Sequence, residues 1–412
     1  MAKTELDTTR ASLRALAEQV LALTDSYQPA PPDSWATEEP LITKAKELIM
    51  QAQSTVDYMG TLTRTTTETV CLRTLLEFNV IQSIPSNGSI GARGLAEKTG
   101  VDQTLLVRLF RILVNSGAVR QNEDGEYSHT HISANFLHPM VSNMFKQIYE
   151  TGLGPIVQLP QFLKYQAEIT GMIEEPGASK DNTYWNLCTY AVGEHGRSST
   201  FQLMEKDPVK MEEFQSNLGG SAHLHPWTGF YDFSKLATED ASRPVFVDVG
   251  GGHGHAISSI LKAHPDIKPE QCVLQDSRAV IDFAQKGNAD LPDTVRKQVH
   301  DFFSPNPVEG ARAYFMRAIA HDLSDQNTVR VLKQIVPVME KDSKLLIADN
   351  IIPEGPLSGN TAVMDMMMMA IGGKERTERD FRDVIHAAGL KLDGIFRAGE
   401  HNTFAILEAS LR

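Results

Sequence analysis

The stretch VFVDVGGGHGHAISSIL, residues 245–261, joins β-branched apolar residues to a helix-like pattern through four glycines. A glycine-rich turn between a strand and a helix lets a ligand approach backbone N–H groups at the helix N-terminus. Such a ligand is most often a nucleotide. The stretch therefore predicts an α/β fold with a nucleotide-like ligand at this turn.

Three motifs compete for this turn. A phosphate-binding loop needs a lysine followed by Ser or Thr, but the residues after the last glycine are His255 and Ala256. The dinucleotide motif G-x-G-x-x-G needs a third small residue where the chain has His255. The remaining pattern, D-x-G-x-G-x-G, suits a ligand with an amino acid and a nucleoside but no phosphate, such as S-adenosylmethionine. Its residues are Asp248, Gly250, Gly252 and Gly254.

A second acidic residue is expected at the end of the next strand, roughly 20 residues on, to hold the ribose hydroxyls. The strand-like stretch CVLQD, residues 272–276, supplies Asp276. The alternative is that these glycines form the tight turn of any α/β protein and that Asp276 is only a loop carboxylate.

Composition and length restrict the class of protein. A chain of 412 residues exceeds what one hydrophobic core normally serves, so we expect two domains and an appendage. The net charge of −13 argues against nucleic acid and anionic membranes as partners. Cys71, Cys188 and Cys272 form no C-x-x-C, which favours a reducing compartment. Without a signal-peptide pattern or an apolar run long enough to span a membrane, we expect a cytoplasmic protein.

The first part of the chain predicts a helical arm and then a winged helix. Residues 8–26 place apolar side chains on one helix face, and the proline-rich QPAPPDSW ends that helix. Residues 89–133 contain two helical patterns joined at TGVD and a hairpin pattern turning at Asp124-Gly125. This order is typical of a winged helix, a fold that many DNA readers share.

The second helix of that pattern, DQTLLVRLFRILVN, carries only Arg108 and Arg111 as cations. A DNA reader needs a basic stripe, so we favour a dimerisation module that buries its apolar surface against a second copy. The predicted domains are an N-terminal arm and linker at 1–40, a winged-helix dimerisation domain at 41–150, and a cofactor-binding catalytic domain with a helical connector at 151–412.

From Val245 onward, strand-like and helix-like stretches alternate, which predicts a parallel sheet covered by helices on both faces. Ligands of such sheets sit at the carboxyl ends of the strands. Four candidate polar residues are expected at these ends: Asp248, Asp276, Arg317 and Asp349.

A candidate base follows one of these strands. The stretch FMRAIAHDLSD places His321 and Asp322 just beyond the strand that ends near Arg317. Histidine is the side chain best matched to proton removal near neutral pH, and a neighbouring carboxylate can stabilise its cation. The alternative is that His321 only caps the following helix.

Five stretches occur in an order and spacing that resemble the plant-type and fungal class of small-molecule O-methyltransferases. They are VDVGGGHG, DFFSPNP, FMRAIAHDLSD, LLIADNIIPEG and GGKERTERDFRDVIHAAGL. The resemblance runs from about residue 40 to the end. It implies a homodimer formed by the winged-helix half, and a Rossmann-like class I methyltransferase domain that binds S-adenosylmethionine without a metal.

The resemblance also implies roles for individual residues. Gly250 and Gly252 would line the methionine part of the cofactor, with Asp248 in the same turn, and Asp276 would hold the ribose. Asp301 and Phe302 would flank the adenine, and Arg317 would stand near the cofactor carboxylate. His321 matches the general base, framed by Asp349 and Glu375. Asp349 stands where the family commonly has a glutamate, and Leu323 replaces the tryptophan of the usual HDW.

These observations predict an O-methyltransferase acting on a phenolic or enolic hydroxyl of a small natural product, with His321 as base. The alternative is a pericyclase or lyase on the same fold that retains the cofactor and rearranges a polyketide-type substrate without methyl transfer. A non-catalytic winged-helix regulator is disfavoured by the charge. The three H-x-H pairs, beginning at His129, His223 and His253, lack a completing ligand cluster, so no metal is expected.

Overall fold

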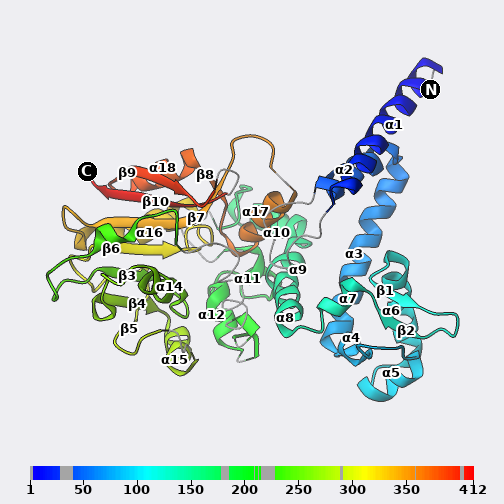
Figure 1. The fold of residues 1–412 in the computed structure, drawn as a ribbon, viewed down its shortest axis with the longest axis horizontal. Helices are drawn as coiled ribbons and strands as arrows, with labels where there is room; N and C mark the ends of the chain where they lie inside the picture. Colours follow the sequence, from blue (N-terminus) through cyan, green and yellow to red (C-terminus); the bar gives the residue numbers. More distant parts are fainter. Residues whose placement is uncertain are drawn as a thin grey trace. The chain divides into compact units, whose positions relative to one another are not determined.

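The computed structural model describes residues 3–27, 40–177, 185–207, 209–211, 213–214, 228–287, 291–357, 359–399 and 403–412 (Figure 1). Two compact units make up the chain, Met1–Tyr149 and Glu150–Arg412. The pair His223/His225 lies outside the described residues.

The first unit is mostly helical. Its elements are α1 (Lys3–Asp25), α2 (Pro40–Ala52), α3 (Thr55–Glu77), α4 (Val80–Ser83), α5 (Ala92–Thr99), α6 (Gln103–Ser116), β1 (Val119–Gln121), β2 (Tyr127–His129), α7 (His131–Asn135) and α8 (Pro139–Ile148). Strands β1 and β2 pair antiparallel on either side of the Asp124-Gly125 turn. The predicted helices on either side of TGVD and the predicted hairpin are therefore confirmed.

Helix ends in this unit follow local chemistry. Ser54 and Asp57 form a capping box that starts α3, and Asp102 accepts a hydrogen bond from the Leu105 backbone N–H to start α6. The winged helix is held by an apolar cluster in which the rings of Phe110 and Tyr127 stack 4.1 Å apart. Burial of each large apolar side chain in such a cluster contributes about 1.5–3 kcal/mol.

The second unit begins with short helices and continues as a sheet domain. The first elements are η1 (Tyr149–Leu153), α9 (Gly154–Ile156), α10 (Leu159–Thr170), α11 (Leu187–Ala191), α12 (Thr200–Glu205) and η2 (Phe233–Leu236). The strands are β3 (Phe246–Val249), β4 (Cys272–Asp276), β5 (Arg296–Val299), β6 (Ala313–Arg317), β7 (Lys344–Ile352), β8 (Arg376–Thr377), β9 (Leu390–Arg397) and β10 (Phe404–Leu411). Between them lie α14 (His255–Ala263), η3 (Pro269–Gln271), α15 (Arg278–Gly287), α16 (Asp325–Ile335), η4 (Val336–Val338), α17 (Gly359–Ile371) and α18 (Glu378–Ala387).

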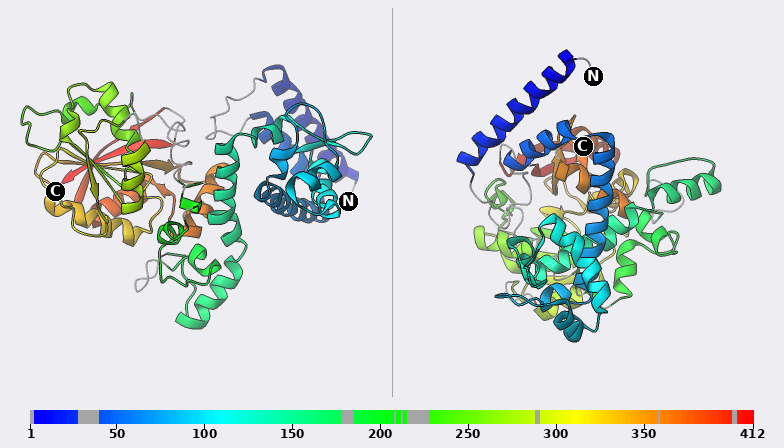
Figure 2. Two further views of the ribbon diagram at one scale, coloured as in Figure 1. Left: turned by 90° about the horizontal axis from the view of Figure 1, so that it is seen from below. Right: turned by 90° about the vertical axis from the view of Figure 1, so that its right-hand side faces the viewer.

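The sheet has the order β5-β4-β3-β6-β7-β10-β9, with β8 paired to the end of β7. In the left view of Figure 2, helices lie on both sides of this sheet. Strands β3 to β7 are parallel, so their carboxyl ends meet at one edge. Strand β10 runs antiparallel to both β7 and β9. The predicted parallel sheet is confirmed for the strands named in the sequence, β3, β4, β6 and β7. Strands β9 and β10, which were not predicted, add a hairpin after the last crossover helix, and a hairpin returns antiparallel.

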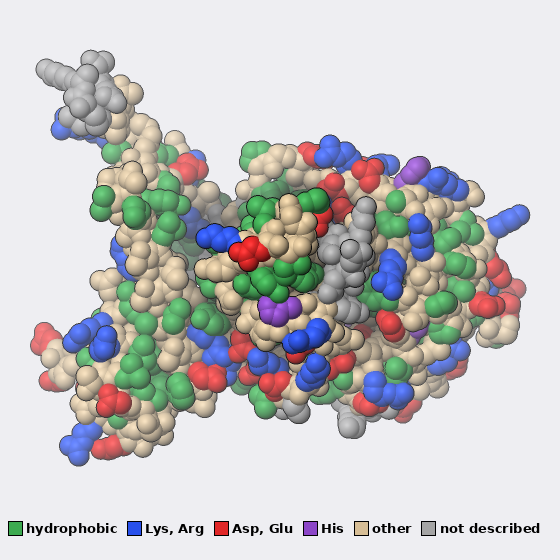
Figure 3. All heavy atoms as spheres, turned by 180° about the vertical axis from the view of Figure 1, so that it is seen from behind, with side chains coloured by type: hydrophobic (Ala, Val, Ile, Leu, Met, Phe, Trp, Pro, Cys, Tyr) green, Lys and Arg blue, Asp and Glu red, His purple; other side chains and the backbone are tan. Residues whose placement is uncertain are grey.

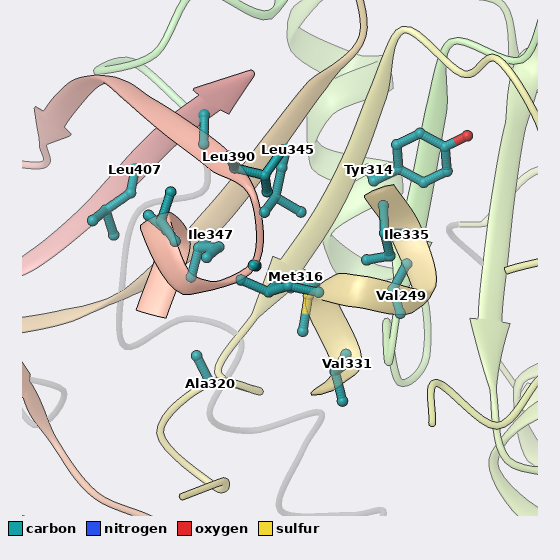
Figure 4. Packing of buried hydrophobic residues seen from close by; sticks show 14 of the residues in the cluster. Val249, Tyr314, Met316, Ala320, Val331, Ile335, Leu345, Ile347, Leu390 and Leu407 are labelled. Carbon is teal, nitrogen blue, oxygen red and sulfur yellow. The ribbon is translucent and has the colours of Figure 1, made fainter. Parts of the chain in front are cut away.

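Both faces of the sheet are buried, which explains the near-continuous apolar runs of its strands. Consecutive residues of one strand point to opposite faces of the sheet, as Phe246 and Val247 do. One face packs against α16 and α18, through residues such as Val331 (Figure 4). The other face packs against α14, α15 and η2. The rigid sheet fixes the edge where the candidate residues gather.

Acidic and basic side chains are interspersed over the described residues of the face in Figure 3. Among the helices that the structure describes, none combines the length and the apolar character that a membrane crossing requires.

Candidate active site

The glycine-rich turn lies between the end of β3 at Val249 and the start of α14 at His255. Gly250, Gly252 and Gly254 have φ of 72°, 57° and 77°, in the left-handed region that favours glycine. A Cβ at Gly251 would lie 2.4 Å from Cγ of Asp248, so this glycine is needed for space. Gly251 was not among the predicted site residues, although its place in the GGG run was a visible signal.

Asp276 ends β4 and closes this turn. Its carboxylate accepts hydrogen bonds from the backbone N–H of Gly252 at 2.8 Å and from that of Ser277 at 2.7 Å. Burial raises the pKa of Asp276 to about 6, although these two hydrogen bonds favour the ionised form. Asp276 and Gly252, both predicted for the cofactor site, are therefore in direct contact.

Asp248 lies beneath the turn and is 1% exposed. Burial, with a contribution from the charge of Asp276, raises the pKa of Asp248 to about 7. Its Oδ2 atom has no hydrogen-bond partner among the described residues. Asp248 is the penultimate residue of β3, one position short of the predicted strand end.

Arg317 ends β6, next to β3 in the sheet. Burial lowers the pKa of Arg317 to about 10, and the charges of Asp248 and Asp349 oppose that shift. Its guanidinium carbon lies 5.5 Å from the centre of the Phe404 ring. Arg317 is therefore a half-buried cation that interacts with carboxylates of the neighbouring strands β3 and β7.

The loop after β5 contributes Asp301 and Phe302. A Cβ at Gly250 would lie 3.9 Å from the Phe302 ring and 2.6 Å from the Ile319 side chain, so the turn runs close to both residues. The Asp301 carboxylate accepts a hydrogen bond from the Phe303 backbone N–H at 3.0 Å. The structure thus brings Phe302 to the glycine turn, while the Asp301 side chain bonds within its own turn.

His321 lies in the loop between β6 and α16, and three carboxylates surround its ring. Nδ1 lies 3.1 Å from Oε1 of Glu375 in a hydrogen bond, and 3.6 Å from Oδ1 of Asp349. Nε2 lies 3.6 Å from Oδ1 of Asp322. The predicted trio of His321, Asp349 and Glu375 is therefore assembled, from residues 28 to 54 positions apart in the chain.

The charge of this cluster favours the imidazolium form. Burial alone would lower the pKa of His321, but the charges of Asp349 and Asp322 and the hydrogen bond that the ring donates to Glu375 raise it to about 10. Burial raises the pKa of Asp322 to about 6 and raises that of Asp349 as well. The cluster therefore stabilises a proton on the His321 ring.

Asp349 contacts the backbone of His321 as well as approaching its ring. Its Oδ2 atom accepts a hydrogen bond from the His321 backbone N–H at 3.1 Å. The shorter aspartate side chain leaves Oδ1 at 3.6 Å from Nδ1, beyond hydrogen-bond length, and Glu375 makes that bond instead. The prediction that Asp349 ends a strand is wrong, because β7 continues to Ile352 through its pairing with β8 and β10.

Glu375 precedes β8 and is 3% exposed. Its backbone N–H donates to Oδ1 of Asp365 on α17 at 3.0 Å, which ties this helix to the cluster. The donor atoms of His321, Asp349 and Glu375 lie within 4.8 Å of one another, a spacing that one cation could bridge. The hydrogen bond between Glu375 and Nδ1 accounts for this spacing without a cation, and the absence of a metal stays a prediction.

The residues around the glycine turn fit S-adenosylmethionine. The positive φ angles and the missing side chains let the turn pack closely on Asp248 and Ile319, while the backbone of Gly250–Gly252 stays partly exposed. Asp276 offers an acceptor at the end of β4, Phe302 offers a ring face, and the unpartnered Oδ2 of Asp248 offers a second acceptor. These groups match an adenosine and an ammonium better than a phosphate, since both carboxylates would repel a phosphate.

Besides Gly251, the sequence analysis did not predict two further residues of the site. Arg376 is fully buried and Asp365 holds the Glu375 backbone. Arg376 lies in the GGKERT stretch, but it contacts the backbone of Ala320 and Leu323. The local sequence pattern does not predict contacts so far apart in the chain.

Comparisons with known proteins match this architecture. The O-methyltransferase domain family matches residues 180–391, and the O-methyltransferase dimerisation domain family matches residues 61–139. Methyltransferase pvhD of Talaromyces variabilis is 33% identical over 329 residues, which cover 79% of this chain and 88% of that protein.

Two solved structures share the fold over nearly the whole chain. OxaC in complex with S-adenosylhomocysteine and oxaline matches with a TM-score of 0.83 at 25% identity, covering 98% of this chain and 100% of that one. A structure described as a pericyclic reaction enzyme matches with a TM-score of 0.76 at 22% identity and the same coverage.

Proposed function

The chain belongs to the family of S-adenosylmethionine-dependent O-methyltransferases, and from this premise we propose that it methylates a phenolic or enolic hydroxyl of a small natural product. The observation that carries the proposal is the hydrogen bond that Nδ1–H of His321 donates to Oε1 of Glu375, at the same sheet edge as the glycine turn. It leaves Nε2 as the ring nitrogen that can take a proton from an acceptor hydroxyl.

The cofactor is S-adenosylmethionine, which when bound supplies an electrophilic methyl group. In our proposal the Gly250–Gly252 turn and Asp248 hold its methionine part, and Asp276 accepts hydrogen bonds from its ribose. Phe302, with Asp301, flanks the adenine, and Arg317 faces the cofactor carboxylate. The assignments of the turn, Asp276 and Phe302 rest on their mutual contacts. Those of Asp301 and Arg317 rest on the resemblance of their motifs to the family.

His321 acts as the general base in this proposal. Its Nε2 accepts the hydroxyl proton, which leaves the acceptor oxygen free to attack the methyl group in line. Glu375 and Asp349 stabilise the resulting imidazolium through Nδ1 and through the nearby negative charge. The two carboxylates orient and stabilise the ring, and neither takes the substrate proton.

The helix next to the cluster supports an apolar substrate. Helix α17 carries Met364 and Met366 in exposed positions, and Asp365 bonds it to the Glu375 backbone. Methionine side chains are flexible and adapt to irregular apolar shapes. We expect the exposed methionines of this helix to offer an adaptable apolar contact for a bulky phenol or enol.

The rival function is rearrangement with retention of the cofactor, and a structure described as a pericyclic reaction enzyme shares this fold. Mass spectrometry of candidate phenols and enols incubated with the enzyme and the cofactor separates the two. Methyl transfer adds one methylene mass to the product and releases one S-adenosylhomocysteine per turnover. A product with the mass of the substrate, with no release of S-adenosylhomocysteine, would favour the rearrangement.

We expect the methylation rate to rise with pH, because the base must be neutral and the pKa of His321 is raised to about 10. Glu375→Gln removes one carboxylate, so it should lower the pKa of His321 and move the rising limb of the pH–rate profile to lower pH. The plateau rate should also fall, because the imidazolium loses stabilisation. Glu378→Gln, at an exposed glutamate three residues on, is the matched control. Superimposable profiles for wild type and Glu375→Gln would contradict this assignment.

We also propose that the first unit forms a homodimer, as the match to the dimerisation domain family suggests. Apolar side chains on α2 and α3 remain exposed, among them Ile49, Val56, Met59 and Leu62. An obligate interface is large and apolar. Light scattering at micromolar concentration should therefore give the mass of two chains, and the mass of a single chain would exclude the dimer.

A further inference from the structure

The loop that carries His321 is held from outside by the segment at 372–376. The backbone N–H of Lys374 donates to the carbonyl oxygen of His321 at 2.8 Å. A Cβ at Gly373 would lie 2.1 Å from the same oxygen, so the two backbones are in direct contact there. The position of His321 therefore depends on a segment more than 50 residues away in the chain.

Arg376 extends this contact on both sides of His321. It is 0% exposed. Its guanidinium donates to the carbonyl oxygens of Ala320 and Leu323, which bracket the His321-Asp322 pair. These two hydrogen bonds hold the backbone of the loop just before His321 and just after Asp322.

Two further bonds attach the same guanidinium to the start of α16. Nε donates to Oδ1 of Asp325 at 2.8 Å, and Nη2 donates to Oγ1 of Thr328 at 3.1 Å. Burying a cation is costly unless it is paired and its donors are bonded. Arg376 meets this condition only while the loop and the helix keep their present arrangement.

We propose that Arg376 is a positioning residue for the methyl-transfer reaction: it holds the backbone on both sides of His321 so that the imidazole stays against Glu375. The inference rests on the proposed function of His321 as base. Glu375 and Arg376 are adjacent, so one short segment fixes the His321 ring through the glutamate and the His321 backbone through the arginine.

Arginine suits this task for a geometric reason. Its planar guanidinium offers five donors in a fixed arrangement, whereas lysine offers three donors from one point. Lysine at 376 keeps the charge but cannot reach both carbonyls, Asp325 and Thr328 together. A lysine variant should therefore be only a partial substitute.

Charged groups lie next to both ring nitrogens of His321. Asp322 lies beside Nε2, and Asp349 and Glu375 lie beside Nδ1. Arg317 lies near Asp349, and Arg376 faces the loop carbonyls and Asp325. If the loop shifts, the ring moves away from Glu375 and Asp349 and its proton affinity falls. The titration of His321 therefore reports its position.

The test compares Arg376→Lys and Arg376→Met with Arg382→Met, an exposed arginine of α18 as the matched control. We expect kcat to fall by about 10- to 100-fold in the Arg376 variants, as for a misplaced catalytic group. The KM for substrate and the affinity for S-adenosylhomocysteine should change less than about twofold, because misplacement of the base leaves binding intact. NMR titration of His321 should move to lower pH in both variants, less so in the lysine variant, and stay unchanged in Arg382→Met.

An unchanged His321 titration in both Arg376 variants would overturn the inference, whatever happens to kcat. If both variants fail to fold, Thr328→Val and Asp325→Ala each remove one hydrogen bond of Arg376 and should show the same changes on a smaller scale. The titration reads the position of His321 even if His321 is not the base, whereas His321→Ala tests the base directly. Failure of the inference and failure of the proposed function are therefore distinguishable.

Discussion

Replacing His321 by alanine should lower kcat for methylation by a factor of about 10² to 10⁴, the usual loss on removal of a general base. The affinity for S-adenosylhomocysteine, measured by calorimetry, should stay unchanged, because the groups around the glycine turn remain. The loss reflects the hydroxyl proton, which then has no acceptor as the methyl group transfers. Asp349→Ala and Glu375→Ala should lose less, because they orient and stabilise the imidazole.

His386→Ala is the matched control for this substitution, since His386 is an exposed histidine of α18, and it should keep the wild-type rate. Full methylation activity in His321→Ala would remove His321 from the mechanism. Turnover of the natural substrate without a mass change would reject the transferase reaction in favour of cofactor-retaining rearrangement. Neither result would alter the family or the fold.

Replacing Asp276 by alanine should weaken binding of S-adenosylhomocysteine by about 100-fold, since a hydrogen bond to a charged acceptor contributes roughly 1.5–3 kcal/mol. The variant loses the acceptor for the ribose hydroxyls, and it also releases the backbone N–H of Gly252 that the carboxylate now holds. Calorimetric titration measures the change. Asp276→Asn keeps one acceptor oxygen, so its affinity for S-adenosylhomocysteine should lie between those of the wild type and Asp276→Ala.

The raised pKa of Asp276 adds a pH dependence to this binding. Its carboxylate is ionised above about pH 6 and protonated below it, so the affinity for S-adenosylhomocysteine should fall as the pH drops through that range. Asp293→Ala, at an exposed loop aspartate, is the control and should bind as the wild type does. The cofactor assignment would be contradicted if Asp276→Ala bound S-adenosylhomocysteine with wild-type affinity, or if the protein bound NAD tightly and S-adenosylhomocysteine not at all.

Local sequence patterns were sufficient to predict most elements near the site. The VFVDV strand, the glycine turn and the following helix were predicted within a residue or two, because hydrophobic period and glycine φ preferences act over a few positions. The antiparallel end of the sheet was missed. Strands β9 and β10 are buried on the sheet, but whether they return parallel or antiparallel depends on the loop between them and on pairing with β7.

The sequence by itself determined the type of residue at each strand end and, through the order of its motifs, the family. Only the tertiary structure decided which of these residues meet. Glu375 reaches Nδ1 of His321 across 54 positions, Asp349 reaches the His321 backbone, and Arg376 holds the loop. These contacts follow from the packing of β7 and the 372–376 segment against the loop after β6. A difference in reach of about 1 Å, such as that of the one methylene between aspartate and glutamate, matters only once that packing exists.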